Sequence, residues 1–221
     1  IDIKKLGINL YFDLDEKSNL EKYSGELKAK VLNTNSVINF KFDKKLEIYN
    51  SFVRNKNIET SFKGFLNLNP YFFYNIDLNV KKINLTKIFK SKKDILPINE
   101  LNSLKKFNGN INIRYDEKKF KNTFFNKILS KLILENGEVL IDKSDISFDG
   151  GSAKFTGRTS KINSSNKFIF DFLITINDQK KIKNWIKDKK NKKDIPSSIN
   201  LNGNLNLFSN KINIEKIVLN N

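Results

Sequence analysis

The stretch Phe107-Asn-Gly-Asn-Ile-Asn-Ile113 places an apolar residue or glycine at every second position, with asparagine between them. Side chains of a β-strand point alternately to the two faces of a sheet, so a period of two puts Phe107, Gly109, Ile111 and Ile113 on one face. The spacing therefore predicts a strand with one apolar face and one polar face.

The same pattern recurs four more times along the chain. The copies are Tyr23-Ser-Gly-Glu-Leu-Lys-Ala29, Phe62-Lys-Gly-Phe-Leu-Asn-Leu68, the weaker Phe155-Thr-Gly-Arg-Thr159, and Leu201-Asn-Gly-Asn-Leu-Asn-Leu207. The glycines stand at positions 25, 64, 109, 157 and 203, which gives intervals of 39, 45, 48 and 46 residues. A nearly constant interval is typical of an architecture that stacks one unit. We expect one repetitive β domain over residues 1–221, cut from a longer chain because it begins at Ile1 and contains no methionine.

The repeated units predict an all-β fold. Edge-to-edge pairing of the units makes one long, twisted, mostly antiparallel sheet with a continuous apolar face. Such a sheet has to curl, pack on another sheet or bind something apolar. Glycine on the apolar face allows a tight bend or the close approach of another element, because a Cβ there would clash. We therefore expect the sheet to curl.

Three short helices are expected to interrupt the strands. Helical spacing of apolar residues predicts helices at 83–91, 97–106 and 178–190, the last with Asp178 as N-cap. The segment 124–129 fits a helix or a strand. The Asn136-Gly137 pair between two short apolar runs predicts a tight hairpin.

Composition argues against several function classes. The chain has no Cys and no His, so thiolate chemistry, disulfides and the commonest general base are absent. We expect no enzyme activity, no cofactor and no metal. The net charge is +17, but the lysines are spread along the chain and no nucleic-acid-binding motif accompanies them. We expect no nucleic-acid partner, whereas attraction to anionic lipid head groups is compatible with this charge.

Three local features have alternative interpretations. The carboxylates of Asp142, Asp145 and Asp149 are oxygen ligands of the kind that calcium takes, although their spacing is neither that of an EF-hand nor that of repeat toxins. The turn at 150–152, Gly-Gly-Ser, could be a phosphate cradle, but a strand rather than a helix follows it. Trp185 on a lysine-rich helix is either an interfacial anchor or, as we prefer, a cover for one end of the groove or core.

The order of features over residues 72–159 resembles the AsmA-like family of Gram-negative envelope proteins, the group that includes TamB and YhdP. The matching segments, in chain order, are the alternating strand 72–80, Ile83-Asn-Leu-Thr-Lys-Ile-Phe89, the run 101–106, Phe107-Asn-Gly-Asn-Ile-Asn-Ile113, Leu134-Glu-Asn-Gly-Glu-Val-Leu-Ile141 and Phe148-Asp-Gly-Gly-Ser-Ala-Lys-Phe-Thr-Gly157. Residues 168–221 are similar as well, with a strand, a short helix, Pro196 and a further glycine strand. The resemblance is one of pattern and covers most of the chain.

The resemblance implies a periplasmic protein that is anchored in the inner membrane by an N-terminal helix outside this sequence. Its sheet would be rolled into an open groove, or taco, lined with apolar side chains. This groove would carry phospholipid, or another acyl-chain lipid, between membranes or serve outer-membrane biogenesis. The residues expected to line the groove are Phe72, Tyr74, Ile76, Leu78, Val80, Ile111, Ile113, Phe168, Phe170, Phe172, Ile174, Ile176, Leu205 and Leu207. The alternative function is that of a structural, adhesin-like β-solenoid with a closed core and no lipid.

Overall fold

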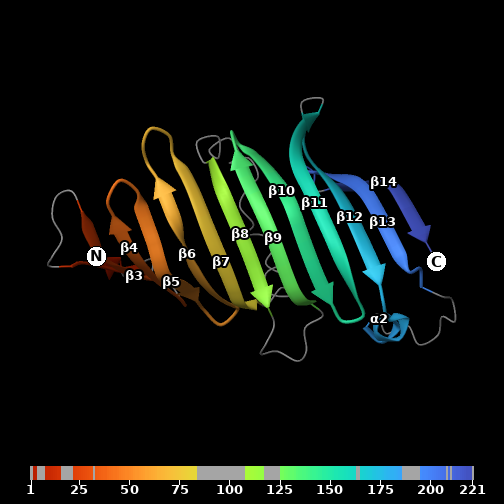
Figure 1. Ribbon diagram of the computed structural model, residues 1–221, viewed down its shortest axis with the longest axis horizontal. Coiled ribbons are helices and arrows are strands. Elements are labelled where there is room, and N and C mark those ends of the chain that lie inside the picture. Colours follow the sequence, from red (N-terminus) through yellow and green to blue (C-terminus); the bar gives the residue numbers. More distant parts are fainter. Residues whose placement is uncertain are drawn as a thin grey trace.

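The protein is a single open β-sheet in which the strands follow one another in chain order. The computed structural model describes residues 2–3, 8–15, 22–31, 33–83, 108–116, 125–162, 165–185, 195–207, 209 and 211–220. Fourteen strands lie side by side from β1 to β14, and the two chain ends lie at opposite ends of the sheet (Figure 1). The predicted fold class, an open all-β sheet, is confirmed.

The strands and the one described helix have the following bounds. They are β1 (Asp2–Ile3), β2 (Ile8–Leu14), β3 (Tyr23–Val31), β4 (Thr34–Phe42), β5 (Leu46–Arg54), β6 (Ile58–Asn67), β7 (Phe73–Ile83), β8 (Asn108–Asp116), β9 (Phe125–Glu135), β10 (Glu138–Phe148), β11 (Gly151–Ile162), β12 (Ser165–Ile176), α2 (Gln179–Trp185), β13 (Ser198–Asn206) and β14 (Lys211–Asn220).

Neighbouring strands are antiparallel with one exception, the parallel pair β7–β8. Short connections suit antiparallel neighbours, whereas a parallel pair needs a longer connection that returns to the other end of the sheet. Residues 84–107 make this connection. Because the sheet has two separate ends and each strand bonds to its neighbours in sequence, the β-solenoid with a closed core does not describe this fold.

Local sequence signals account for several of the turns and ends. Asn136 and Gly137 both have positive φ, at 53° and 84°, as the predicted tight hairpin between β9 and β10 requires. The ambiguous segment 124–129 forms the start of strand β9 where it is described. Helix α2 confirms the start of the helix predicted at 178–190. Of the helix predicted at 83–91, Ile83 is instead the last residue of strand β7, and the other residues lie outside the described residues. The helix predicted at 97–106 also lies outside them.

Register shifts lie beside several of the repeated glycines. The β5–β6 register shifts next to the pair Ile48–Gly64, and the β10–β11 register shifts next to the pair Ile141–Gly157. A third shift falls at Gly203, between β13 and β14. Extra residues at such bulges bend a strand and increase its twist. Three of the five repeated glycines thus lie beside irregular places in the ladder, whereas Gly25 and Gly109 lie in regular register.

The same glycines give room to aromatic rings from neighbouring strands. A Cβ built on Gly109 would lie 2.6 Å and 2.7 Å from two ring carbons of Tyr74, and one built on Gly157 would lie 2.6 Å from Cε1 of Phe168. Real Cβ atoms do not approach other atoms so closely, so the rings occupy the space that a side chain would need. The close approach expected from the sequence is confirmed at these positions.

Candidate apolar binding groove

Strand pairing joins the apolar positions into one continuous face, called the apolar face below. Directly paired residues of neighbouring strands point to the same side of a sheet. For example, Leu78 of β7 pairs with Ile113 of β8. Further along the sheet, Phe172 of β12 pairs with Leu201 of β13. By this register, all the predicted lining residues that lie within strands share the apolar face: Tyr74, Ile76, Leu78, Val80, Ile111, Ile113, Phe168, Phe170, Phe172, Ile174, Ile176 and Leu205. Phe72 directly precedes β7, and Leu207 directly follows β13.

The structure does not gather these residues into one site. Those on β7 and β8 are separated from those on β12 and β13 by the three strands β9, β10 and β11. Apolar residues absent from the predicted set fill this gap on the same face: Ile128, Leu132, Leu134, Val139, Ile141, Ile146, Phe148, Ala153 and Phe155. Their period-two alternation is visible in the sequence and could have identified them.

Phe155 of β11 is the most consequential of the missed residues. Its ring centroid lies 6.1 Å from that of Phe168, 6.4 Å from that of Phe170 and 5.8 Å from that of Phe172. Three predicted lining residues therefore meet around one that sequence reasoning left out. Aromatic contacts of this kind stabilise beyond the area they bury.

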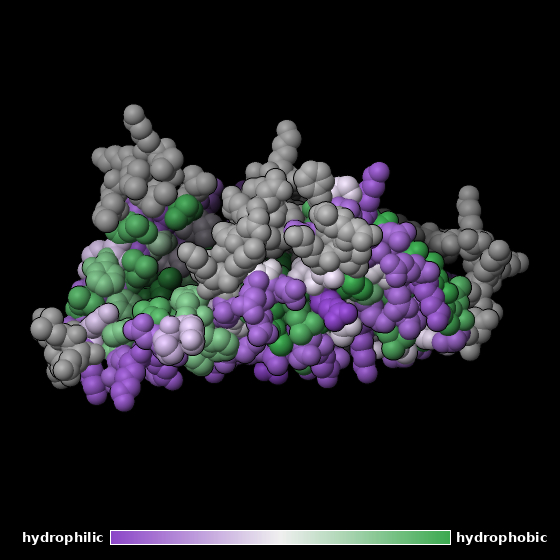
Figure 2. Space-filling model, turned by 90° about the horizontal axis from the view of Figure 1, so that it is seen from above, coloured by the Kyte–Doolittle hydropathy of each residue, from purple (hydrophilic) through white to green (hydrophobic). Residues whose placement is uncertain are grey.

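Most of the apolar face is only partly covered. Of the predicted lining residues within strands, Val80 is buried, at 9% exposure, and the others are half-buried. At the N-terminal end, Phe12 is 57% exposed and stacks on the buried ring of Phe40 at 5.7 Å. Figure 2 shows hydrophobic side chains gathered in a hollow at this end, on the left of the view, and hydrophilic side chains along the lower side.

A half-open cavity on the apolar face lies between strands β9–β13 and helix α2. This cavity has a volume of about 400 Å³, within the range of small-molecule sites. Every residue that lines it is apolar: Phe125, Ile146, Phe148, Ala153, Phe172, Ile174, Ile176, Ile182, Ile195 and Ile199. Its most buried members are Phe148, Ala153 and Ile182, at 7%, 3% and 8% exposure. The cavity offers contact to apolar groups and no side-chain hydrogen bond.

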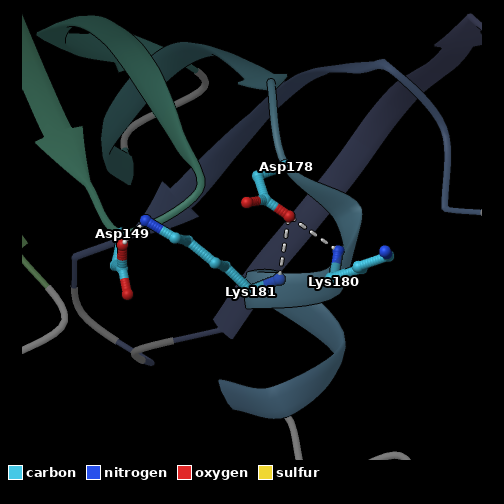
Figure 3. Close-up of polar contacts among 4 residues, drawn as sticks. All are labelled: Asp149, Asp178, Lys180 and Lys181. Carbon is cyan, nitrogen blue, oxygen red and sulfur yellow. Dashed lines mark hydrogen bonds and ion pairs between the residues drawn. The ribbon is translucent and has the colours of Figure 1, made fainter.

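Helix α2 covers this cavity through Ile182, and polar contacts hold the helix in place (Figure 3). The Asp178 carboxylate accepts hydrogen bonds from the backbone N–H groups of Lys180 and Lys181 at 3.0 and 3.1 Å, which makes it the N-cap predicted from the sequence. Lys181 Nζ lies 2.9 Å from Asp149 Oδ1 in the turn before β11. This hydrogen bond to Asp149 raises the pKa of the Lys181 ammonium.

The same turn binds the start of the helix through its backbone. The N–H groups of Asn177 and Asp178 both donate to the carbonyl oxygen of Gly150, at 2.9 and 3.0 Å. Gly150 has a φ of 98°, and an added Cβ would lie 3.1 Å from Ile182 Cδ1. The Gly-Gly-Ser turn therefore serves to dock α2, and its geometry gives the phosphate-cradle interpretation no support. The role predicted for Trp185 concerns a side chain outside the described residues.

The opposite face of the sheet is mostly polar and carries a larger groove of about 790 Å³ over strands β5–β10. Asn112 Nδ2 donates to Asp77 Oδ1 at 2.8 Å. Asp142 pairs with Lys131 at 3.5 Å and Asp145 with Lys143 at 3.1 Å. Since Asp149 meets Lys181, each carboxylate of the possible calcium site has a different lysine partner. The part of the chain that the structure describes contains no group of three or more His, Cys, Asp or Glu residues that could hold a metal ion.

Two serines interrupt the apolar face at the middle of the sheet. Ser130 of β9 pairs with Ser144 of β10, between Ile113 on one side and Phe155 on the other. Ser144 is buried, at 5% exposure, and Ser130 is half-buried. The Ser144 hydroxyl donates to the Ser130 hydroxyl, so the buried hydroxyl has a partner. The apolar face thus runs past them without an unpaired hydroxyl.

Searches of protein-family models, of curated proteins and of solved structures find no match to this chain. Among the described residues, no helix is long and apolar enough to cross a membrane.

Proposed function

We propose that the protein is a non-enzymatic lipid-handling module whose apolar face takes the acyl chains of phospholipid or of another acyl-chain lipid. The observation that supports this most directly is the cavity beneath α2, which is lined by apolar residues alone and continues into the half-buried apolar face. A groove without polar groups suits a hydrocarbon chain and gives a polar metabolite no partner.

The energetics of an open apolar groove suit a carrier better than a store. Burial of one methylene contributes about 0.8 kcal/mol, so a sixteen-carbon chain would gain roughly 12 kcal/mol if it were fully buried. Association costs about 4–15 kcal/mol in lost freedom. A half-open groove buries only part of the acyl chain and therefore gains only part of this free energy. It also offers few polar contacts that would have to break, so a bound chain can move along the face.

The cellular setting of this proposal comes from the resemblance to the AsmA-like family. It comprises a periplasmic location, an inner-membrane anchor outside these residues, and phospholipid transport between membranes or outer-membrane biogenesis. The net charge of +17 is compatible with contact to anionic head groups. It is the acyl-chain groove, however, that the described residues support.

The test compares two isoleucines on the same strand, β12. Ile174 lies on the apolar face and lines the cavity, whereas Ile169 lies on the polar face opposite Arg158 and Asn204. Both are half-buried, so a lysine at either position perturbs the strand in a similar way. Ile174→Lys should lower the affinity for a fluorescent fatty acid at least about tenfold, or ~1.4 kcal/mol. Ile169→Lys should leave the affinity close to that of the unchanged protein.

Solvent extraction of the purified protein, followed by mass spectrometry, should reveal phospholipid in the unchanged protein and in Ile169→Lys, and less of it in Ile174→Lys. Circular dichroism checks that both variants remain folded. Absence of lipid from the unchanged protein together with no fatty-acid binding would refute the proposal.

A further inference from the structure

The floor of the cavity beneath α2 is formed by one small residue, Ala153. All the other described residues that line the cavity are isoleucine or phenylalanine. Strand pairing places Ile146 of β10 on one side of Ala153 and Ile174 of β12 on the other. These neighbours project further from the sheet than the alanine methyl group does. The hollow therefore lies over Ala153, where the side chain is shortest.

Two segments form a wall at one end of the cavity. Ile182 of α2 and Ile195, which lies before β13, both line it. The side-chain amide of Gln179 donates through Nε2 to the carbonyl oxygen of Ile195 at 2.8 Å. The N–H of Ile176 donates to the carbonyl oxygen of Ser197, also at 2.8 Å. These bonds join the helix and the segment before β13 to each other and to the end of β12.

The apolar lining continues away from this wall along β11 and β12. Phe172 lines the cavity, and the ring centroid of Phe155 lies 5.8 Å from that of Phe172 and 6.4 Å from that of Phe170. On β9 and β10 the same row of the sheet carries Ser130 and Ser144, because Ser144 pairs with Phe155. A hydrocarbon chain that leaves the cavity therefore has continuous apolar contact along β11 and β12.

We propose that the cavity beneath α2 holds the methyl end of an acyl chain, and that the small side chain of Ala153 provides the room for it. The inference rests on the proposed function, because it takes an acyl chain as the ligand. It adds the direction in which the chain binds and the residue that makes this direction possible. The polar end of the lipid lies away from α2, toward the Phe168 end of β12.

The chemistry of the two ends of the lipid determines this direction. The cavity lining has no polar side chain, so a carboxylate or phosphate placed there would lose its hydration without gaining a side-chain hydrogen bond. A terminal methyl group has no hydrogen bond to lose, and its burial is favourable.

The length of the apolar path agrees with this placement. The hydrocarbon core of a bilayer is about 30 Å thick and consists of two layers of acyl chains, so one chain spans about 15 Å. From Ile174, which lines the cavity, to Phe168 the strand β12 spans about 20 Å at about 3.4 Å per residue. A chain whose methyl end lies in the cavity therefore remains on apolar residues over its whole length.

The first experiment tests the direction on the unchanged protein, by displacement of a fluorescent fatty acid. ω-Hydroxyhexadecanoic acid carries a hydroxyl at the methyl end of the chain, whereas α-hydroxyhexadecanoic acid carries the same hydroxyl beside the carboxylate. The ω-hydroxy acid would bury its hydroxyl without a side-chain partner and should bind at least about tenfold more weakly than hexadecanoic acid. The α-hydroxy acid should bind about as tightly as hexadecanoic acid.

Three outcomes of this comparison contradict one or both proposals. Equal binding of the two hydroxy acids would overturn the inference, and so would weaker binding of the α-hydroxy acid alone, which would mean the reverse direction. In both cases the proposed function stands, because acyl chains bind. Displacement by none of the acids, with no binding of the fluorescent fatty acid, would overturn the proposed function and the inference with it.

The second experiment fills the cavity from its floor. Ala153→Leu places a larger apolar side chain where the methyl end would lie. Each methylene that loses its buried contacts lowers the affinity about fourfold, so the affinity for hexadecanoic acid should fall at least about tenfold. The penalty for the ω-hydroxyl should disappear, because the end of the chain no longer lies in the cavity. A folded Ala153→Leu protein that keeps this penalty would overturn the inference.

Ala29→Leu is the matched control, because it makes the same substitution on the apolar face of β3. Ala29 pairs with Leu10 and Ser36, far from the cavity. This variant should keep both the affinity for hexadecanoic acid and the ω-hydroxyl penalty, and loss of either would contradict the placement of the methyl end. Circular dichroism checks folding, and Ala153→Val replaces Ala153→Leu if leucine prevents folding, since valine is smaller and suits a strand.

Lysophosphatidylcholine with a hexadecanoyl chain distinguishes the two sources of the acyl chain. Displacement of the probe from the unchanged protein, but at least about tenfold less from Ala153→Leu, would assign the cavity to a phospholipid chain. If hexadecanoic acid alone shows this difference, the ligand is a free fatty acid. If neither shows it, the cavity does not hold the methyl end and the inference is overturned.

Discussion

Gly109→Ala is expected to destabilise the protein by about 1–3 kcal/mol, the usual cost of an extra group in a well-packed site. Gly109 lies on β8 opposite Tyr74 of β7 in the parallel pair. The added methyl group would lie 2.6 and 2.7 Å from two ring carbons of Tyr74 and would also meet the Tyr74 carbonyl oxygen. The ring can rotate away, but the carbonyl belongs to the backbone at the β7–β8 pairing. Part of the strain therefore has to be taken up by the ladder.

The measurement is the free energy of unfolding in urea, together with the melting temperature. For a protein of this size, 1 kcal/mol corresponds to about 2–4 °C, so the melting temperature should fall by roughly 2–12 °C. Asn110→Ala is the control, because Asn110 is the next residue and points to the polar face. In a Tyr74→Leu background the cost of Gly109→Ala should be smaller but not zero, since the contact with the carbonyl remains.

The reasoning fails if the free energies of unfolding of Gly109→Ala and Asn110→Ala differ by less than about 0.5 kcal/mol, which is typical of ordinary surface changes. The repeated glycine would then be a tolerated small residue rather than a position that close packing requires. An equal cost with and without the Tyr74 ring would assign the strain to the backbone alone.

Three further predictions concern the ring of Tyr74, the cap of α2 and the β9–β10 turn. Burial raises the pKa of the Tyr74 phenol. The stability that the neutral phenol contributes is fully present below the unfolded pKa of about 10 and is lost as the pH rises through the folded pKa. Between pH 9 and pH 11, the free energy of unfolding in urea should therefore fall less in Tyr74→Phe than in the unchanged protein. Asp178→Ala removes the acceptor for two helix N–H groups and should destabilise helix α2 by about 1 kcal/mol. Hydrogen exchange at the amides of Lys180 and Lys181 should become faster, with little change in exchange from the sheet. Gly137→Ala forces a Cβ into a left-handed conformation with φ of 84° and should lower the free energy of unfolding by about 1–2 kcal/mol, whereas Ser152→Ala should stay within about 0.5 kcal/mol.

The sequence predicts the strands well because their apolar residues repeat with a period of two that no helix shares. The run Phe168–Ile176 shows this clearly, since five alternate apolar residues all lie on the apolar face of β12. The hairpin at Asn136-Gly137 is predictable for a related reason, because positive φ at both residues is common only for such pairs. These signals are local and need no knowledge of the rest of the fold.

Which residues lie together in the candidate site depends on the order of the strands in the sheet. The periodicity of the sequence does not give this order. A period of two assigns each residue to a face but does not say which strands are neighbours. The apolar strands predicted at 72–80 and 168–176 were therefore expected to line one groove, although several strands separate them in the sheet. The docking of Ile182 over the cavity was hidden for the same reason. It depends on Gly150 and Asp149, in a turn that precedes α2 by an entire hairpin.

In the part of the chain that the structure describes, the strands form a single layer, and helix α2 packs on it near one end. Among the described residues, few apolar side chains are buried: Phe40, the paired Val80 and Tyr115, and the cluster of Phe148, Ala153 and Ile182. Each strand therefore depends mainly on its two neighbours, as in repeat proteins, and a local change should weaken nearby strands more than distant ones. A single layer also leaves large apolar side chains exposed along its face and at β14. Exposed apolar patches of this extent mark interaction sites, and the acyl chains that we propose as ligands would cover this surface.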